Sequence, residues 1–489
     1  GTSVRFDNTF IWPLLREGMS RGPPIDELHF SQEPDVGDVP GPNSKSLLEK
    51  QRAVDTNAVA YPRRVPVALD AAKGATIRDV DGNVFLDFFA GIGVLNVGHS
   101  NPYVLEGVHE QLDDIAHTVD FPTEARIEFI ERLNDIAPDG LSGNSKVIFG
   151  GPSGSDAIEG SIKLAKHNTG RHGLLAFEGA YHGTTAGALS LTAGKSYKEG
   201  YGPHLADAVH VPYPDPTETG PGGDVAALCP AENCCQTGVC ARSLDAVQRK
   251  FEGAYGGHED PAAIWVEPIQ GEGGVVVPPE GFLRGLRDIA DDNDAMLIFD
   301  EIQTGFGRTG EWFAADHWGV TPDAMTMAKG IGGSGLPIGA MLYHEKYDTW
   351  GPGGHVGTFR GNVPAFVGGI RAIEYVEDHD LLAHATAVGD YIRSRFRELA
   401  EEVPQIIDVR GKGQFTGVEF RVDGNPSKSL VEEIQRGCYH EGVMVWYAGR
   451  EKSVLRLLPP LVLTQRQAEV GMDIICEVIQ QVVPEPAAA

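Results

Sequence analysis

The chain has 489 residues, 41% hydrophobic and 22% charged, which is typical of a globular protein with more than one domain. Its net charge of −29 argues against nucleic-acid binding, because such a surface repels the phosphate backbone. No uncharged apolar run is long enough to span a membrane, and residues 1–7 lack the features of a signal peptide, so the cytoplasm is the expected location. The acidic, lysine-poor composition further suggests a protein adapted to high salt.

The first part of the chain, residues 1–75, is rich in Pro, Gly and Asp, and we interpret it as an N-terminal arm lying on another surface. It carries an apolar patch at residues 10–15. Residues 76–88 then alternate polar and apolar side chains around an Asp-Gly pair, which predicts a β-hairpin.

From residue 101 the sequence alternates short apolar strands with helical segments. The expected strands are 146–149, 173–177, 208–211, 262–266 and 295–299, and the clearest helices between them are 156–167 and 282–291. This alternation predicts an open, mostly parallel α/β sheet with helices on both faces, in a large domain over residues 76–361. Ligands of such sheets bind at the carboxyl ends of the strands.

Residues 212–260 interrupt this pattern and are interpreted as an insertion, which contains four cysteines: Cys229, Cys234, Cys235 and Cys240. They could form a metal clip or local disulfides, but the adjacent pair does not fit the usual zinc spacing. We expect free thiols and predict no metal site. Beyond residue 362, a long helix, a segment at 409–421, a strand at 454–458 and a helix at 465–480 predict a smaller C-terminal α/β domain over residues 362–489.

Two residues carry the strongest chemical signal. Lys329 lies in a nearly uncharged stretch of small residues, 326–340, which favours a lowered pKa and carbonyl chemistry. Asp300 ends an apolar strand, where an acid suits a partner for the ring nitrogen of pyridoxal phosphate. Each residue alone also fits a plainer interpretation, a solvated lysine in a loop and an acid capping a strand.

Other candidates follow neighbouring strands. Small residues at 150–159, with Gly154 and Ser155, join a strand to a helix and could cradle a phosphate. Tyr181 could stack on a pyridine ring or be a core tyrosine, and His182 beside it could be a satisfied turn histidine.

Three charged residues lie in apolar surroundings. Glu267 and Glu272 need partners if they are buried. Arg456, between two leucines, requires a planar anion, which could be Glu272 in the resting state or a substrate carboxylate.

Taken in order, these motifs resemble a class III aminotransferase of fold type I over residues 50–480. The motifs are Ser-Gly-Ser-Asp (153–156), Tyr-His-Gly (181–183), Glu-Pro-Ile-Gln-Gly-Glu-Gly-Gly (267–274), Asp-Glu-Ile-Gln-Thr-Gly-Phe-Gly-Arg-Thr-Gly (300–310), Ala-Lys-Gly (328–330), Gly-Thr-Phe-Arg-Gly-Asn (357–362) and Arg-Leu-Leu-Pro-Pro-Leu (456–461). The resemblance implies a large domain with a mostly parallel seven-stranded sheet, pyridoxal 5′-phosphate as cofactor, and a homodimer or higher even oligomer.

The resemblance also implies residue roles around the cofactor. Lys329 would bind its aldehyde covalently and shuttle the proton, Asp300 would keep its ring nitrogen protonated, and Gln303 would bind the ring hydroxyl. Tyr181 would stack on the ring, and we group His182 with it as cofactor-binding.

Further roles concern the phosphate and the substrates. Gly154 and Ser155 would hold the phosphate together with Thr358 of the neighbouring subunit. Glu272 would pair with Arg456 until a dicarboxylate takes the arginine, and we group Glu267 with these substrate-binding residues.

The substrate prediction rests on one departure from the family. In 4-aminobutyrate and ornithine aminotransferases an arginine follows Tyr-His-Gly, but here the residue is Thr184, which cannot hold a carboxylate as a guanidinium does. Segments 57–63, 153–157 and 357–362 look most like 2,4-diaminobutyrate:2-oxoglutarate 4-aminotransferases. Arg360 could supply the missing charge across the interface, or be an interface arginine paired with an acid.

The expected reaction passes the terminal amine of L-2,4-diaminobutyrate, the amino donor, to 2-oxoglutarate, the 2-oxo acid, with no nucleic-acid or membrane partner. The alternatives are another ω-amino-acid aminotransferase, an amino-acid racemase or epimerase on the same scaffold, and a non-catalytic protein whose cysteines sense redox state or metal.

Overall fold

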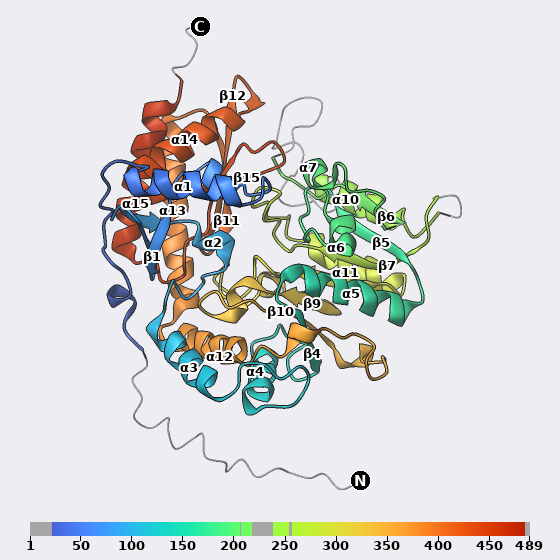
Figure 1. The fold of residues 1–489 in the computed structure, drawn as a ribbon. Coiled ribbons are helices and arrows are strands. Elements are labelled where there is room, and N and C mark those ends of the chain that lie inside the picture. The colour runs from blue at the N-terminus through green and yellow to red at the C-terminus, as the bar shows by residue number, and fades with distance from the viewer. Residues whose placement is uncertain (1–21, 206, 218–237, 254–256, 485–489) are drawn as a thin grey trace.

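The computed structural model describes residues 22–205, 207–217, 238–253 and 257–484, and Figure 1 shows their arrangement. Residues 10–15, the apolar patch of the predicted arm, lie outside this part of the chain. Within the described residues, no helix combines the length and the apolar character that crossing a membrane requires.

The largest element is a seven-stranded sheet with the order β4-β10-β9-β8-β7-β5-β6. Its strands are β4 (Ser145–Gly151), β5 (Gly173–Phe177), β6 (Ala208–Val211), β7 (Pro261–Val266), β8 (Met296–Asp300), β9 (Ala324–Met327) and β10 (Gly339–His344). Only β10 runs antiparallel to its neighbours, β4 and β9. The predicted α/β class and mostly parallel sheet are confirmed, whereas β9 and β10 were not among the predicted strands.

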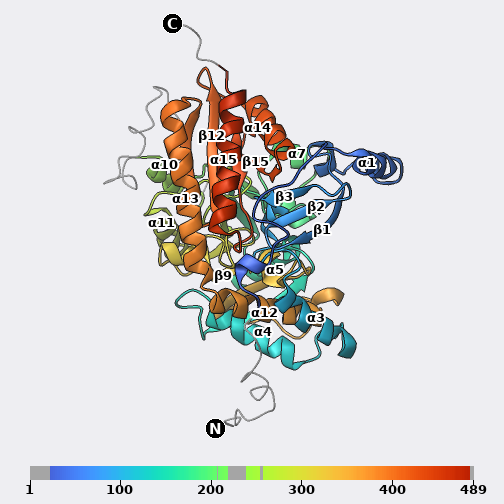
Figure 2. The same cartoon turned by 90° about the vertical axis from the view of Figure 1, so that its left-hand side faces the viewer.

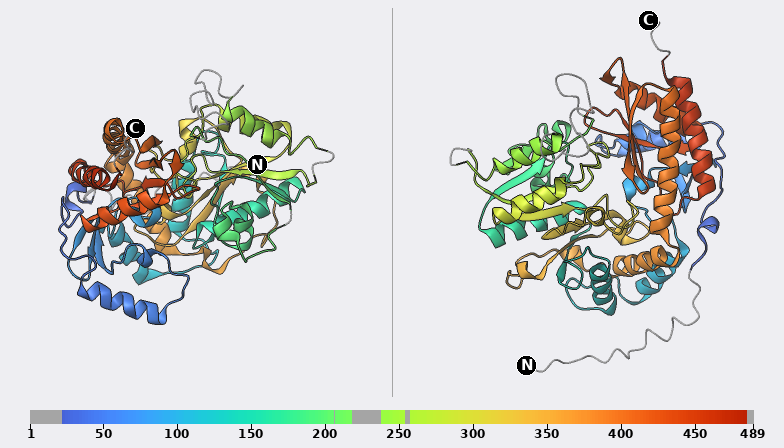
Figure 3. Two further views of the ribbon diagram at one scale, coloured as in Figure 1. Left: turned by 90° about the horizontal axis from the view of Figure 1, so that it is seen from above. Right: turned by 180° about the vertical axis from the view of Figure 1, so that it is seen from behind.

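Both faces of this sheet are covered by helices (Figures 1 and 3). In β7 the side chains alternate: Trp265 packs in the core beneath α5 (Gly154–Thr169) and donates from Nε1 to Ser161 Oγ at 2.9 Å. Ile264 and Val266 face the opposite core, which includes residues of α11 (Phe282–Asp292). Burial on both faces explains why the predicted strands are continuous apolar runs.

Further helices complete the large body. They are α2 (Ala90–Gly93), α3 (Pro102–Asp114), α4 (Glu124–Asp135), α6 (Ala186–Leu191), α7 (Lys195–Lys198) and α12 (Val363–Asp378). Phe366 of α12 packs against Phe129 of α4 and Phe149 of β4, so α12 shares the core of the large sheet although it follows the boundary predicted at residue 362.

The predicted hairpin is confirmed as β2 (Thr76–Asp79) and β3 (Val84–Asp87), which pair antiparallel. They follow α1 (Pro42–Val54) and β1 (Leu69–Lys73). β3 pairs in parallel with β14 (Val443–Met444), near the other end of the chain. The N-terminal segment is therefore bound to the C-terminal body.

The C-terminal body has a second sheet, β11-β12-β16-β15, with β13 (Asn425–Pro426) paired to β12. Its elements are β11 (Ile406–Lys412), β12 (Phe415–Val422), β15 (Trp446–Ala448), β16 (Val454–Leu457), α13 (Leu381–Glu402), α14 (Lys428–His440) and α15 (Gln465–Val482). Figure 2 shows α13 and α15 side by side against this sheet. The predicted final strand and closing helix correspond to β16 and α15.

A helix, α10 (Val239–Gln248), lies within the segment predicted as an insertion and connects β6 to β7. Its buried residues include Val239, Cys240 and Val247, so this end of the segment continues the alternation of strands and helices. Cys229, Cys234 and Cys235 lie outside the described residues.

Candidate active site

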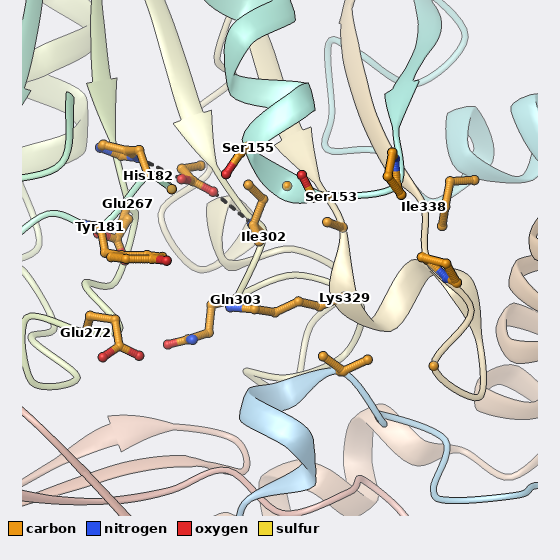
Figure 4. A pocket seen from close by; sticks show the side chains of 18 of the residues that line it. Ser153, Ser155, Tyr181, His182, Glu267, Glu272, Ile302, Gln303, Lys329 and Ile338 are labelled. Carbon is orange, nitrogen blue, oxygen red and sulfur yellow. Dashed lines mark hydrogen bonds and ion pairs between the residues drawn. The ribbon is translucent and has the colours of Figure 1, made fainter. Parts of the chain in front are cut away.

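The carboxyl ends of the parallel strands surround a cavity of about 330 Å³ (Figure 4). Nine of the twelve predicted site residues line it: Gly154, Ser155, Tyr181, His182, Glu267, Glu272, Asp300, Gln303 and Lys329. They come from the segments after β4, β5, β7, β8 and β9, the edge where ligands of parallel sheets bind.

Lys329 begins the short 3₁₀ helix η5 (Lys329–Gly332) directly after β9, with a left-handed φ of 51°. Its side chain extends across the cavity toward Gln303 (Figure 4). Burial disfavours the ammonium form and lowers the pKa of Lys329 to about 8, against the opposing effect of Glu272. A larger fraction of this amine than of an ordinary lysine is therefore neutral, and hence nucleophilic, near neutral pH.

Asp300 and His182 form a buried pair beside the lysine. Asp300 Oδ2 is 2.7 Å from His182 Nδ1, and Oδ1 accepts from the Ile302 amide at 3.0 Å. Burial alone would lower the pKa of His182, but the bond to Asp300 outweighs it and raises this pKa. His182 Nε2 is buried without a partner among the described residues. The pair fixes a carboxylate at the cavity wall.

The start of α5 forms a tight cradle. Ser153 donates from its amide and its hydroxyl to Asp156 Oδ2, at 3.0 and 2.8 Å, which fixes the first turn. A Cβ on Gly183 would lie 2.1 Å from Ser155 Oγ, so only glycine lets the 181–183 turn approach the helix this closely. Helix N-termini and closely approaching backbone of this kind favour an anion such as phosphate.

Glu267 anchors two turns of the cavity wall. It accepts from the Tyr181 amide at 3.0 Å and from the Gly271 amide at 2.8 Å. Burial raises the pKa of Glu267 to about 7, although nearby His182 opposes this. The Tyr181 ring packs edge-on against Tyr197, with centroids 5.1 Å apart, so one wall of the cavity is aromatic.

Arg456 reaches the site from β16 of the C-terminal sheet. Its NH1 donates to Glu272 Oε1 at 2.5 Å and to Gln303 Oε1 at 3.3 Å. Burial acts against ionisation of Glu272, but Arg456 lowers the pKa of that carboxyl below its usual value. Arg456 Nε and NH2 are fully buried and have no hydrogen-bond partner among the described residues, so the guanidinium keeps unused donors beside Glu272.

Three predicted residues do not line the cavity: Arg456, which is buried behind it, and Thr358 and Arg360, which lie in the short helix η7 (Thr358–Arg360). Thr358 is exposed, and its carbonyl lies 2.6 Å from His117 Nε2. Arg360 is nearly buried, paired with Asp120 and bonded to the His355 carbonyl. The pairing with an acid is one of the two interpretations that the sequence left open for Arg360.

Other lining residues were not predicted from the sequence. They are Val94, Pro152, Ser153, Gly183, Ile302, Ala328, Gly335, Leu336, Pro337 and Ile338. All but Val94 lie inside the segments at 150–159, 181–183, 300–310 and 326–340 that the sequence analysis singled out, so the motifs themselves were the signal. Val94 comes from the N-terminal part of the chain, where the sequence shows no such signal.

Comparison with known proteins agrees with this arrangement. The family model for aminotransferase class III matches residues 58–479. The chain is 38% identical, over 86% of its length and 90% of the relative's, to the diaminobutyrate–2-oxoglutarate aminotransferase of Rhizobium meliloti. It is 35% identical to the alanine/serine racemase of Pyrococcus horikoshii, covering 89% of this chain and 90% of that one. It superimposes on the (S)-enantioselective omega-transaminase of Thermomicrobium roseum with a TM-score of 0.80 at 28% identity, covering 90% and 99% of the two chains.

A mostly parallel sheet with a partly buried lysine and a buried acid at its carboxyl edge defines a fold type I pyridoxal-phosphate enzyme. Within that class, the chain belongs to the class III aminotransferases. The cavity fits the cofactor of this family: Lys329 offers a reactive amine, Asp300 a fixed carboxylate, and the start of α5 an anion cradle.

Proposed function

We propose that the protein transfers the terminal amino group of L-2,4-diaminobutyrate to 2-oxoglutarate, producing aspartate 4-semialdehyde and glutamate. The proposal is supported by the R. meliloti relative, whose name states this pair of substrates. It is also supported by Arg456, which is paired with Glu272 and could exchange this carboxylate for that of a substrate. When bound, the cofactor supplies the electron sink that makes the carbon–hydrogen bond beside the nitrogen acidic.

The Glu272–Arg456 pair is the observation that carries the proposal. In diaminobutyrate, the carbon that carries the terminal amine bears hydrogen atoms and no carboxylate. Arg456 can therefore remain paired with Glu272 in the first half-reaction. 2-Oxoglutarate carries a carboxylate beside its reacting carbon, and the unpartnered Nε and NH2 of Arg456 suit that planar anion. One site thus serves two substrates of different charge.

The other residues act by position. We propose that Lys329 would hold the cofactor through its aldehyde, and that the Lys329 amine would move the proton at the reacting carbon of the substrate. Asp300, held by His182, would offer a negative charge to the ring nitrogen of the cofactor. Tyr181 would cover the ring and Gln303 would bind its hydroxyl, while Glu267 holds the Tyr181 turn in place.

We further propose a homodimer in which Thr358 completes the partner's phosphate site. Its support is an exposed apolar patch of Phe121, Val356 and Phe359, with 76%, 66% and 70% of their surfaces accessible. The two loops that carry the patch are joined by a bond from the Thr118 amide to the Gly361 carbonyl at 3.0 Å. Large apolar side chains gathered in this way mark interfaces between proteins.

The dimer is tested by sedimentation velocity. Phe359→Asp introduces a charge into the patch and is expected to shift the protein toward monomer. Val54→Asp changes another exposed apolar residue, on α1, and should leave the association unchanged. A Phe359→Asp protein that sediments like the unmodified one would contradict the proposed interface.

The reaction is tested with a panel of amino donors against 2-oxoglutarate, read out as glutamate. Diaminobutyrate should be preferred over ornithine and 4-aminobutyrate. The racemase relative supplies the rival, because a racemase interconverts alanine or serine enantiomers and forms no glutamate. Racemisation of these amino acids without glutamate production would overturn the proposal.

A further inference from the structure

The proposed function requires a second carboxylate site, because diaminobutyrate and 2-oxoglutarate both carry a carboxylate at the end away from the reacting carbon. Arg456 lies on the reacting side, next to Gln303. Thr184 is exposed and uncharged, and Arg360 is already paired with Asp120 outside the cavity. None of these residues provides a free cation for the distal carboxylate.

Lys452 is a cation close to two residues of the cavity wall, Tyr181 and Glu272. Its Nζ lies 5.9 Å from the centre of the Tyr197 ring, which packs on Tyr181 of the cavity wall. It is half-buried, yet its Nζ has no hydrogen bond or ion pair with any residue in the described part of the chain. Several effects act on the pKa of the Glu272 carboxyl. Burial is the largest and raises this pKa, whereas Arg456 and, to a lesser extent, Lys452 lower it. Lys452 therefore lies close to this carboxyl.

The backbone fixes Lys452 relative to the Glu272–Arg456 pair. The Gly449 amide donates to the Glu272 carbonyl at 3.0 Å, and the Lys452 amide donates to the Gly449 carbonyl at 3.0 Å. Arg456 follows four residues after Lys452, in β16. The turn that carries Lys452 is thus joined directly to the loop of the active-site acid.

Lys452 also occupies a conformation that lysine disfavours. Its φ is 59°, in the left-handed region where glycine is cheapest. A lysine in this position costs conformational energy, and strained non-glycine residues concentrate at functional sites.

From this geometry we propose that Lys452 binds the distal carboxylate of both substrates. In diaminobutyrate and in 2-oxoglutarate the same length of carbon chain separates the reacting carbon from this carboxylate, so one fixed cation serves both half-reactions. Arg456 then binds the second carboxylate of 2-oxoglutarate alone. Lys452 supplies the charge that the family's arginine, replaced here by Thr184, provides in other members.

The test measures equilibrium binding of glutarate to the holoenzyme by calorimetry, which requires no turnover. Glutarate has both carboxylates of 2-oxoglutarate but no reacting carbonyl. Lys452→Met keeps the apolar stem and removes the charge, and it should weaken glutarate binding about tenfold. Lys452→Arg should retain binding. Lys428→Met removes an exposed lysine paired with Glu432 and should change nothing.

Unchanged glutarate affinity in Lys452→Met would overturn the proposal, and so would an equal loss in Lys428→Met. In steady-state assays Lys452→Met should raise the KM for 2-oxoglutarate and diaminobutyrate about tenfold and leave kcat nearly unchanged. The inference rests on the proposed function, but the two fail separately. If the unmodified enzyme made no glutamate from diaminobutyrate while Lys452→Met still lost glutarate, only the assigned donor would be wrong.

Discussion

Replacing Glu272 with alanine tests whether the acid balances the buried arginine. Arg456 is fully buried, and its NH1 would keep only the longer contact to Gln303. Breaking a buried ion pair costs about 3–5 kcal/mol, and we take about 3 kcal/mol because Glu272 retains 18% exposure. For 489 residues at about 2.1 cal/mol/K each, the unfolding entropy is about 1 kcal/mol/K. The expected fall in Tm is therefore about 3 °C.

Differential scanning calorimetry measures this shift, with and without saturating glutarate. Glutarate should narrow the gap between Glu272→Ala and the unmodified protein, because its carboxylate replaces the missing anion. The control is Glu33→Ala, which removes the acid of the exposed pair with Arg466 and should cost less than about 1 kcal/mol. Equal Tm values for Glu272→Ala and the unmodified protein without glutarate would refute the assignment of Glu272 as the counter-ion of Arg456.

Three further predictions concern charge. Asp300→Asn should lower the pKa of His182, seen by NMR titration, and reduce kcat at least about a hundredfold; an unchanged histidine titration would contradict the pairing. The rate at which apoenzyme binds pyridoxal phosphate covalently should rise with pH through about 8, because only the neutral amine of Lys329 attacks. Absorbance spectroscopy follows this reaction. A rate whose pH midpoint lies near the pKa of free lysine would contradict the prediction. With a net charge of −29, the Tm should increase from dilute buffer to about 1 M potassium chloride, and a flat or falling Tm would dismiss salt adaptation.

Much of the fold follows from local sequence patterns. The hairpin at residues 76–88 is marked by two short strands around an Asp-Gly turn, and the structure confirms it as β2 and β3. The strand ending at Asp300 is a continuous apolar run, because both of its faces are buried. Strands β9 and β10 were missed: β9 is short and lies beside the glycine-rich lysine loop, and the reversed direction of β10 depends on tertiary pairing.

The residues of the candidate site likewise divide into those that the sequence predicts and those that depend on tertiary contacts. Residues in motifs after consecutive strands, such as Lys329, Asp300 and Ser155, could be placed together because parallel strands end at one edge. Lys452 could not, since it lies in a turn of the C-terminal sheet that is joined to the Glu272 loop through backbone hydrogen bonds. The pairing of Arg360 with Asp120 likewise depends on contact between distant loops.

The central claim is that Lys329 carries the cofactor. Borohydride reduction of the holoenzyme, followed by proteolysis and mass spectrometry, measures this directly. We predict one modified peptide, with the phosphopyridoxyl group on Nζ of Lys329. A label on another lysine, or the same labelled fraction in Lys329→Ala, would contradict the account.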